Sequence, residues 1–483
     1  MSLTSDVAKA AASRGWKPRP SRELQRFQNS VFDRLRRRGK PILVLAPLAN
    51  VTGTCCGSVE ELQRCRTPSL TFRSCTAFSG LVDASFRKVI ARYGKPDVMY
   101  TEFVSTGGLI RGASKLMSDL LYSTEERPIV AQLFGSDPAE MYDCVIKVKR
   151  MGFDGVDINM GCPDRTVCRQ GCGAGLIDRP ELAQAIIGAA QLAAEEDHGF
   201  EDMRFVTPQL SPDSAEISPS LEKLLDPRHH DPHLPPTIVS PKSEIFQSTK
   251  IYDGLLQRAP IRRRPFSVSV KTRIGSAKET IDEWIPKVLE MHPDAMTVHF
   301  RTRKEQSLVP AHWTDEVVGK TVDWVKNRFG HETLVMGNGD VRTPEEALQK
   351  IDRWGLDGVM IGRGIYGNPF LFSKASNGLP APQQRLNALL EHHLLYEELL
   401  GDVKPMAIMK KHYKAYVVGF QDCKIHRGRL MDAKTTDEVV VIIKDLIQQL
   451  NEGRLAIRTN PEDFQLPTPD PSLMENEPDD VLT

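Results

Sequence analysis

Short apolar runs recur along the middle of the chain, and they predict eight β-strands. Most are nearly continuous runs of aliphatic and β-branched residues, the pattern of parallel strands that are buried on both faces. Helix-like stretches such as Pro138–Met151, Glu279–Met291 and Thr343–Trp354 separate most of them. The predicted strands are Ile42–Ala46, Val98–Phe103, Ile129–Phe134, Gly155–Asn159, Ser267–Lys271, Ala295–His299, Leu334–Met336 and Gly358–Ile361.

Eight strands that alternate with helices predict an α/β protein, a (β/α)8 TIM barrel. A doubly wound sheet is the alternative, but the Gly-x-Gly-x-x-Gly turn that this fold places after its first strand is missing. From about residue 384 apolar residues recur at helical spacing instead, which predicts a C-terminal all-helical domain. We divide the chain into a basic N-terminal extension (1–40), a barrel (41–380) with irregular insertions at 53–82 and 197–262, a helical domain (384–457) and an acidic tail (458–483).

The composition of the chain excludes some classes of protein. The chain has 483 residues and a formal net charge of +0, which excludes a globally basic nucleic-acid coat but not a local basic face. No apolar run approaches the about 20 residues that cross a bilayer, so we expect no membrane association, and no secretory core follows Met1. Nine cysteines in a chain of this length indicate reduced thiols in an intracellular compartment.

The two ends of the chain carry opposite charge. Residues 1–40 hold 11 Lys and Arg against 3 Asp and Glu, with a dense basic run over Arg34–Lys40. That run is interpreted as a solvated helix end, with an organelle-targeting leader and an RNA contact as alternatives. Residues 458–483 hold 7 acidic residues and several prolines, which predicts disorder.

Polar residues cluster where the predicted strands end, at the face of a barrel that carries catalytic residues. A convergence of amide, thiol, ammonium, imidazole and guanidinium groups on one rim is a stronger signal than any one of them. The residues concerned are Gln132, Asn159, Cys162, Lys271, His299, Arg301, Asn338, Gly339, Gly362 and Arg363. The glycine pairs after strands seven and eight, together with Arg363, predict an anion site, with tight turns alone as the alternative.

Two of these residues admit competing interpretations. Lys271 ends an apolar strand and requires an anionic or electron-rich partner, either a flavin ring edge or a salt bridge with Glu102. Cys162 is interpreted as a proton donor or nucleophile, against a buried structural cysteine or a metal site with Cys168 and Cys172, whose spacing matches no common pattern. The histidines of 229–233 are interpreted as part of a solvated loop, since no second ligand cluster accompanies them.

Six motifs together resemble the tRNA-dihydrouridine synthases, over about 41–52, 83–196 and 263–450. They are Ala46–Thr52, Asn159-Met160-Gly161-Cys162-Pro163, Val270–Gly275, His299–Thr302, Gly337–Asp340 and Ile361–Gly364. The Asn-x-Gly-Cys-Pro element is the most specific of them. The resemblance implies FMN, NADPH as electron donor, and reduction of the C5–C6 double bond of selected uridines in tRNA, with Cys162 as the proton donor to C5.

The same resemblance implies roles for the other rim residues. Gln132, Lys271 and His299 would line the flavin, with Pro47 and Leu48 packed against it, and its phosphate would lie at Asn338, Gly339, Gly362 and Arg363. Asn159 would lie near the ring or the uracil, and Arg301 near the substrate entrance. Residues 404–434 hold 8 Lys and Arg against 2 Asp, so Lys410, Lys411 and Lys414 are the expected tRNA contacts, with a solvated helix as the alternative.

The chain departs from the family pattern at Gly53–Val82, since deleting this segment would join Val51-Thr52 to Asp83–Arg87 as the family usually has them. It is interpreted as an insertion or as retained intron sequence. Two rival functions stay open: an FMN barrel dehydrogenase that acts on a small molecule, and a catalytically impaired RNA-binding homologue. We expect a monomer without a stable protein partner, in the cytoplasm or nucleus rather than the mitochondrion.

Overall fold

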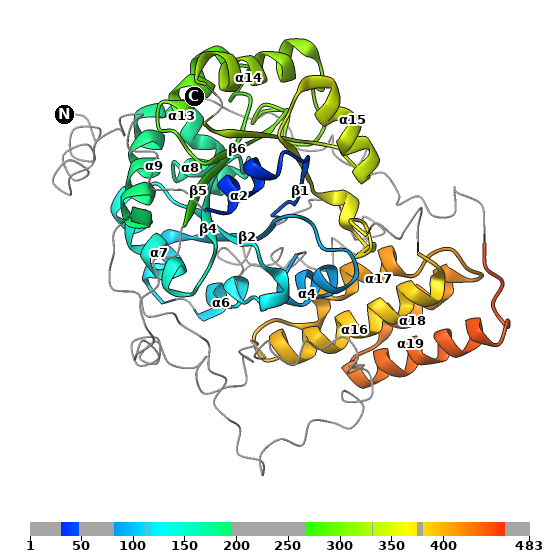
Figure 1. The fold of residues 1–483 in the computed structure, drawn as a ribbon. Coiled ribbons are helices and arrows are strands. Elements are labelled where there is room, and N and C mark those ends of the chain that lie inside the picture. Colours follow the sequence, from blue (N-terminus) through cyan, green and yellow to red (C-terminus); the bar gives the residue numbers. More distant parts are fainter. Residues whose placement is uncertain are drawn as a thin grey trace, which may run out of the picture.

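The computed structural model of the protein describes residues 30–47, 82–112, 114–195, 266–330, 332–373 and 380–458. Eight parallel strands form one sheet in the order β1-β8-β7-β6-β5-β4-β3-β2. A parallel bridge between Val44 and Val98 joins its two ends, so the sheet closes into the predicted barrel (Figure 1). The strands are β1 Ile42–Leu45, β2 Met99–Ser105, β3 Ile129–Phe134, β4 Gly155–Met160, β5 Ser267–Arg273, β6 Ala295–His299, β7 Leu334–Asn338 and β8 Gly358–Ile361.

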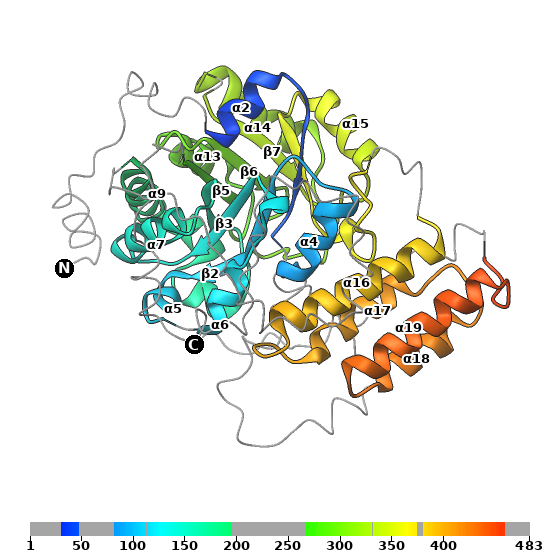
Figure 2. The same ribbon diagram turned by 60° about the horizontal axis from the view of Figure 1, so that its bottom comes forward.

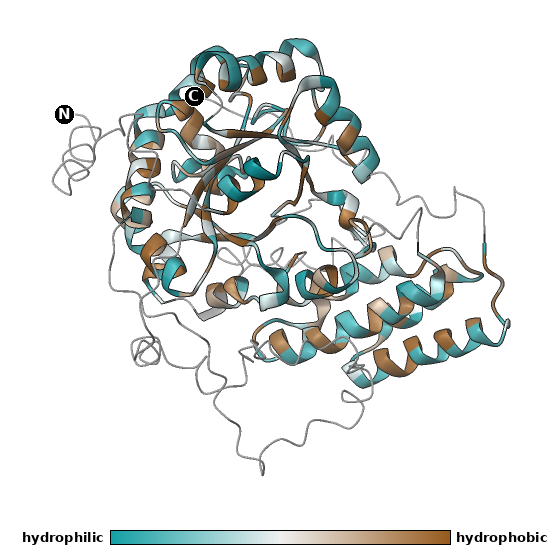
Figure 3. Cartoon of the chain, viewed as in Figure 1, coloured by the Kyte–Doolittle hydropathy of each residue, from teal (hydrophilic) through white to brown (hydrophobic). Residues whose placement is uncertain are grey.

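The strands are buried along nearly their whole length, which is why they have continuous apolar sequences (Figure 3). Strands β2, β5 and β7 extend two residues beyond their predicted ends. The added residues of β5 and β7 include Arg273 and Asn338, whose polar side chains interrupt the apolar pattern although their backbones continue the ladder.

Helices surround the barrel, and local capping explains several of their ends. Asp137 accepts hydrogen bonds from the backbone N–H groups of Ala139 and Glu140 and so begins α7, with Pro138 in the first turn. Thr343 caps α15 in the same way, and Gly355 ends it with a φ of 66°. The helices around the barrel are α4 Ala84–Tyr93, α5 Thr106–Ile110, α6 Ser114–Met117, α7 Pro138–Arg150, α8 Arg165–Arg169, α9 Pro180–Glu195, α13 Ile281–Leu289, α14 Lys320–Asp323 and α15 Pro344–Trp354.

Helix α2 (Val31–Arg38) lies across the amino-terminal end of the barrel (Figure 1). Val31, Phe32 and Leu35 are buried and belong to the same apolar cluster as the starts of the strands. The arginines of the basic run face solvent, as the interpretation of a solvated helix end requires. The packed barrel therefore includes α2, which the sequence analysis assigned to the N-terminal extension.

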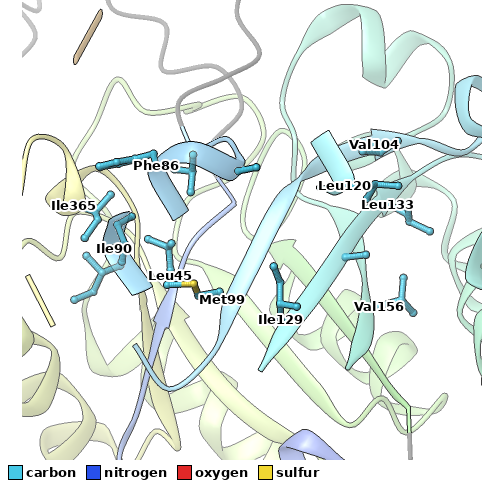
Figure 4. Packing of buried hydrophobic residues seen from close by; sticks show 14 of the residues in the cluster. Leu45, Phe86, Ile90, Met99, Val104, Leu120, Ile129, Leu133, Val156 and Ile365 are labelled. Atoms are coloured by element: carbon cyan, nitrogen blue, oxygen red, sulfur yellow. The ribbon is translucent and has the colours of Figure 1, made fainter. Parts of the chain in front are cut away.

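The carboxy-terminal helices pack beside the barrel on the side of α4 (Figure 2). They are α16 Pro382–Leu400, α17 Lys410–Tyr416, α18 Cys423–Asp432 and α19 Thr436–Asn451. Phe86 of α4 stacks on His392 of α16 with ring centroids 4.9 Å apart, and Tyr93 donates a hydrogen bond of 2.7 Å to Glu391. On its other side α4 covers the barrel core, where Ile90, Leu45 and Met99 lie close together (Figure 4). Helix α4 is thus the joint between the two parts of the protein.

Several predicted segments lie outside the described residues. They are the chain before Ser30, the insertion at 53–82 except for Val82, the insertion at 197–262 with its histidines, and the acidic tail after Arg458. Among the described helices, none has the length and apolar composition to cross a membrane.

Candidate active site

The Cys162 thiol lies in the turn after β4, at the carboxy-terminal end of the barrel. Its backbone is fixed by the Asn159 side chain, whose Oδ1 accepts hydrogen bonds from the N–H groups of Gly161 (3.0 Å) and Cys162 (2.9 Å). The Cys162 carbonyl in turn accepts from the N–H of Ala174 at 2.9 Å and from the Cys168 thiol at 3.4 Å. The turn is therefore held on both sides of its reactive residue, which is half-buried.

Burial raises the pKa of the Cys162 thiol to about 11, while the nearby Arg273 guanidinium lowers that pKa in part. At neutral pH the group is therefore a thiol and carries a proton that it can donate. No group of three or more His, Cys, Asp or Glu residues within the described parts of the chain is arranged to hold a metal ion. The described structure thus gives no support to a metal site at Cys162, Cys168 and Cys172.

Lys271 on β5 points into the barrel beside this turn. Ser269 and Lys271 alternate along the strand and share a face, and Ser269 faces inward because it donates a 2.6 Å hydrogen bond to Asp157 of β4. Burial, and then the charge of Arg273, lower the pKa of Lys271 to about 8. Within the described residues the Lys271 ammonium makes no hydrogen bond or ion pair. Glu102, the alternative partner that the sequence suggested, ion-pairs instead with Lys404 at 3.7 Å.

Two arginines organise the rest of the rim, Arg273 at the end of β5 and Arg301 in the loop after β6. Arg273 donates to the carbonyl of Gly161 at 2.7 Å and to that of Thr302 at 2.9 Å, which ties the Cys162 turn to the loop after β6. Arg301 is only 2% exposed and hydrogen-bonds His299 Nε2 at 2.9 Å, the Val309 carbonyl and Asp340. Arg301, which the resemblance places near the substrate entrance, is buried there and holds the His299 ring, the loop at Val309 and Asp340 together.

His299 is surrounded by positive charge. Burial, and then the charges of Arg273, Lys271, Arg301 and Arg363, hold the pKa of His299 well below its ordinary value. The imidazole is therefore neutral at physiological pH and acts as a hydrogen-bonding group rather than as a cation.

The loops after β7 and β8 meet through Asp340, which ion-pairs with Arg301 and lies 2.7 Å from Arg363. The Arg363 side chain is 40% exposed, so the guanidinium has surface left for an anion. Asn338 is already used within the chain, since its amide donates to the Met360 carbonyl at 2.8 Å, and the Gly339 carbonyl accepts from Trp313 at 2.8 Å.

The glycines of β7 are explained by protein contacts that the sequence did not reveal. A Cβ at Gly337 would lie 2.6 Å from the Trp313 ring, and one at Gly339, whose φ is 129°, would lie 2.6 Å from Ala311. The sequence analysis attributed these glycines to an anion site, with tight turns alone as the alternative. The structure shows that a neighbouring loop already occupies both positions.

The remaining predicted residues fall into three groups. Gln132 and Asn159 hydrogen-bond each other at 2.9 Å inside the barrel. Pro47 and Gly362 lie at the ends of β1 and β8, and Leu48 lies outside the described residues. On α17, Lys414 is exposed, Lys411 is half-buried, and Lys410 donates to the Met431 carbonyl of α18. Of these three lysines, only Lys414 is exposed.

Sequence reasoning missed the carboxylate beneath this site. Asp157 is fully buried in β4 and accepts hydrogen bonds from Gln132 and Ser269, each at 2.6 Å. Burial raises the pKa of Asp157 to about 6, and its two hydrogen bonds and Lys271 oppose that shift. The signal was a charged residue two positions before Asn159 in an apolar strand, where both side chains point to the same face.

Comparison with known proteins identifies the family of this chain. A model of the Dihydrouridine synthase (Dus) family matches residues 77–200 and 259–451, well over half of the chain. The chain belongs to the dihydrouridine synthase family. The resemblance found in its motifs is thereby confirmed, and the family match includes β2 to β8, the Cys162 turn and helices α16 to α19.

Curated bacterial members of the dihydrouridine synthase family are similar over most of their length. A probable tRNA-dihydrouridine synthase of Staphylococcus aureus (strain COL) is 29% identical over 378 residues, which cover 77% of this chain and 92% of that protein. Probable tRNA-dihydrouridine synthase 2 of Bacillus subtilis (strain 168) is 28% identical, with 77% and 93% covered. A Staphylococcus epidermidis relative is 30% identical, with 74% and 88% covered. A solved DHODH structure from Eimeria tenella aligns with a TM-score of 0.28 and 14% identity over 58% of this chain and 63% of that one, a likeness too distant to inform function.

Proposed function

We propose that this protein is a tRNA-dihydrouridine synthase that uses FMN and NADPH to reduce the C5–C6 double bond of uridines in tRNA, with Cys162 as the proton donor to C5. The observation that carries the proposal is a protonated, half-buried thiol beside the Lys271 ammonium, which makes no hydrogen bond or ion pair within the described residues. The curated relatives, named as probable tRNA-dihydrouridine synthases, support tRNA as the substrate.

The residues at the rim fit a flavin. The Lys271 ammonium needs a negative or electron-rich partner inside the barrel, and the Arg363 guanidinium retains exposed surface for a phosphate. Lys271, Gln132 and His299 would line the ring, with Pro47 and Leu48 packed against it. Asn338, Gly339, Gly362 and Arg363 would surround the phosphate, with Asn338 and Gly339 contributing through groups that Met360 and Trp313 do not already use.

The reaction adds a hydride and a proton to the two carbons of one double bond. Bound flavin, reduced by NADPH, would supply the hydride to C6 of the uracil. Negative charge then develops at C5, and the Cys162 Sγ–H donates its proton there, which leaves a thiolate. The charge of Arg273 lowers the pKa of Cys162, and Cys162 in turn raises the pKa of Lys271, so both cations would stabilise the thiolate until solvent returns its proton.

Asn159 positions both partners of this proton transfer. Its Oδ1 holds the backbone of the Cys162 turn, and one N–H of its amide is used by Gln132. The second N–H makes no hydrogen bond within the described residues, so it is available to a carbonyl of the uracil. The target base has to leave its stack to reach this depth, and exposed cations on the helical domain, Lys414 and Lys424, would contact tRNA phosphates.

The test is conversion of tRNA by the purified, flavin-loaded protein. Unmodified tRNA incubated with NADPH should gain two hydrogens at one or a few uridines, read by mass spectrometry of nuclease fragments. Reduction of free pyrimidines but not of tRNA would favour the small-molecule dehydrogenase. Binding of tRNA by a protein without a flavin spectrum would identify the impaired RNA-binding homologue.

A further inference from the structure

A chain of hydrogen bonds connects the fully buried Asp157 to the Cys162 turn. Ser269 Oγ and Gln132 Nε2 donate to the two oxygens of Asp157, each at 2.6 Å. Gln132 Oε1 accepts from Asn159 Nδ2 at 2.9 Å. Asn159 Oδ1 then accepts from the N–H of Cys162 at 2.9 Å. Three neighbouring strands, β3, β4 and β5, supply these side chains, whose exposure is between 0% and 6%.

The charge of Asp157 gives this chain of bonds its direction. An ionised carboxylate only accepts hydrogen bonds, so Gln132 must turn its Nε2 toward Asp157 and its Oε1 toward Asn159. Asn159 must then turn its Nδ2 toward Gln132, which leaves its Oδ1 facing the N–H groups of Gly161 and Cys162. With a neutral amide in place of Asp157, both orientations of Gln132 would satisfy the network equally, and the turn would lose its acceptor in half of the arrangements.

We propose that Asp157 is a positioning residue that holds the Cys162 turn in its proton-donating geometry through the amides of Gln132 and Asn159. The effect of Asp157 on catalysis rests on the proposed function. The hydrogen bonds also predict how fast the Cys162 thiol is alkylated, and that rate does not depend on any substrate. A carboxylate without solvent at the centre of a barrel is costly, and the wall of the barrel alone would be served by an apolar residue. The chain of hydrogen bonds from Asp157 through Gln132 and Asn159 to Cys162, called the relay below, explains why a charged residue occupies this position.

The test replaces the carboxylate by an amide of the same shape, Asp157→Asn, in the flavin-loaded protein. The first measurement is the rate at which iodoacetamide alkylates Cys162 at pH 8, followed by mass spectrometry of the peptide that contains it. A released turn exposes the thiol and relieves the burial that raises its pKa, so alkylation should accelerate about tenfold or more. The second measurement is turnover: kcat with tRNA should fall about tenfold, the loss expected when a hydrogen bond to a charged group is removed.

Asp154→Asn is the matched control. Asp154 is also buried and immediately precedes β4, but it lies at the opposite end of the barrel, where it accepts from the Ile129 N–H at 2.9 Å and pairs with Arg127. This variant should lose stability without a change in the alkylation of Cys162. Equal acceleration in both variants would mean general loosening of the barrel, and would overturn the relay.

Ser269→Ala provides a second, milder variant that retains the Gln132 bond. It removes one of the two donors to Asp157, so alkylation of Cys162 should accelerate about two- to threefold. Wild-type alkylation rates in both Ser269→Ala and Asp157→Asn would overturn the proposal. If the wild-type protein does not reduce tRNA, the proposed function fails, whereas the alkylation comparison still decides whether the relay exists.

Discussion

Lys404 ties the helical domain to the mouth of the barrel, and its replacement by methionine should separate the two parts. The side chain is 7% exposed, hydrogen-bonds Asp119 and lies 3.7 Å from Glu102 in the middle of β2. Burial alone would lower the pKa of Lys404, but attraction by Glu102 and Asp119 outweighs it and raises this pKa above its ordinary value. A raised lysine pKa stabilises the folded state fully at neutral pH, and the stabilisation is lost only as pH rises through and beyond 10.5.

Lys404→Met removes the cation that the carboxylates of Glu102 and Asp119 share. Breaking one side of a buried ion pair costs about 3–5 kcal/mol. With a urea dependence of about 3 kcal/mol per molar, the upper end of the usual range because the slope increases with protein size, the unfolding midpoint should fall by about 1–2 M. The assay is urea unfolding at pH 7 followed by circular dichroism, together with limited proteolysis, because the two parts of the protein need not unfold in one step.

Two further variants make the Lys404 experiment decisive. Lys414→Met removes an exposed lysine from the same helical region and should change stability by less than about 0.5 kcal/mol. The double variant Lys404→Met, Asp119→Asn removes one of the orphaned charges and should recover part of the loss. A midpoint for Lys404→Met equal to that of Lys414→Met would refute the reasoning, since it would mean that the buried charges are solvated or neutralised without the lysine.

Three other outcomes are expected from the site and the helical domain. Cys162→Ala should lower the rate of tRNA reduction about 100-fold or more while flavin reduction by NADPH proceeds at the wild-type rate; equal loss of both half-reactions would make the cysteine structural. Because burial raises the pKa of Cys162 to about 11, the rate at which iodoacetamide alkylates Cys162 should still be rising with pH at pH 9.5, and a plateau reached below pH 9.5 would show an unburied thiol. Burial lowers the pKa of His393 to about 4, so folding stability should be full above pH 6.5 and decrease as pH falls toward 4; a His393→Gln protein with the same loss of urea midpoint between pH 7 and 5 would contradict this assignment.

The eight strands were predictable because a parallel barrel buries both faces of each strand, which leaves a continuous apolar sequence. The strand ends were less predictable. Arg273 and Asn338 continue the backbone ladder although their side chains are polar. The packing of helix α2 against the barrel was missed for a related reason, since its basic residues outnumber the three apolar side chains that are buried there. Charge along the sequence does not show which side of a helix faces the core.

The residues of the candidate site were predictable, but many of their partners were not. The rule that catalytic groups lie at strand ends placed Cys162, Lys271 and His299 at one rim. It could not show that Lys404 forms an ion pair with Glu102, because those residues are about three hundred positions apart in the chain. It also could not distinguish a glycine that admits a ligand from one that admits Trp313, because both need the same missing Cβ.

The joint at α4 has a consequence for how the specificity of such a protein can change. In the proposed function, the groups that transfer hydrogen lie in the barrel, whereas much of the basic surface lies on helices that contact it through α4 and Lys404. A long, rigid RNA held by those helices acts as a lever, so a small rotation at the joint shifts which nucleotide stands over the thiol. Under the proposed function, substitutions at Glu391 or His392 would therefore redirect the protein to another nucleotide while the redox chemistry stays intact.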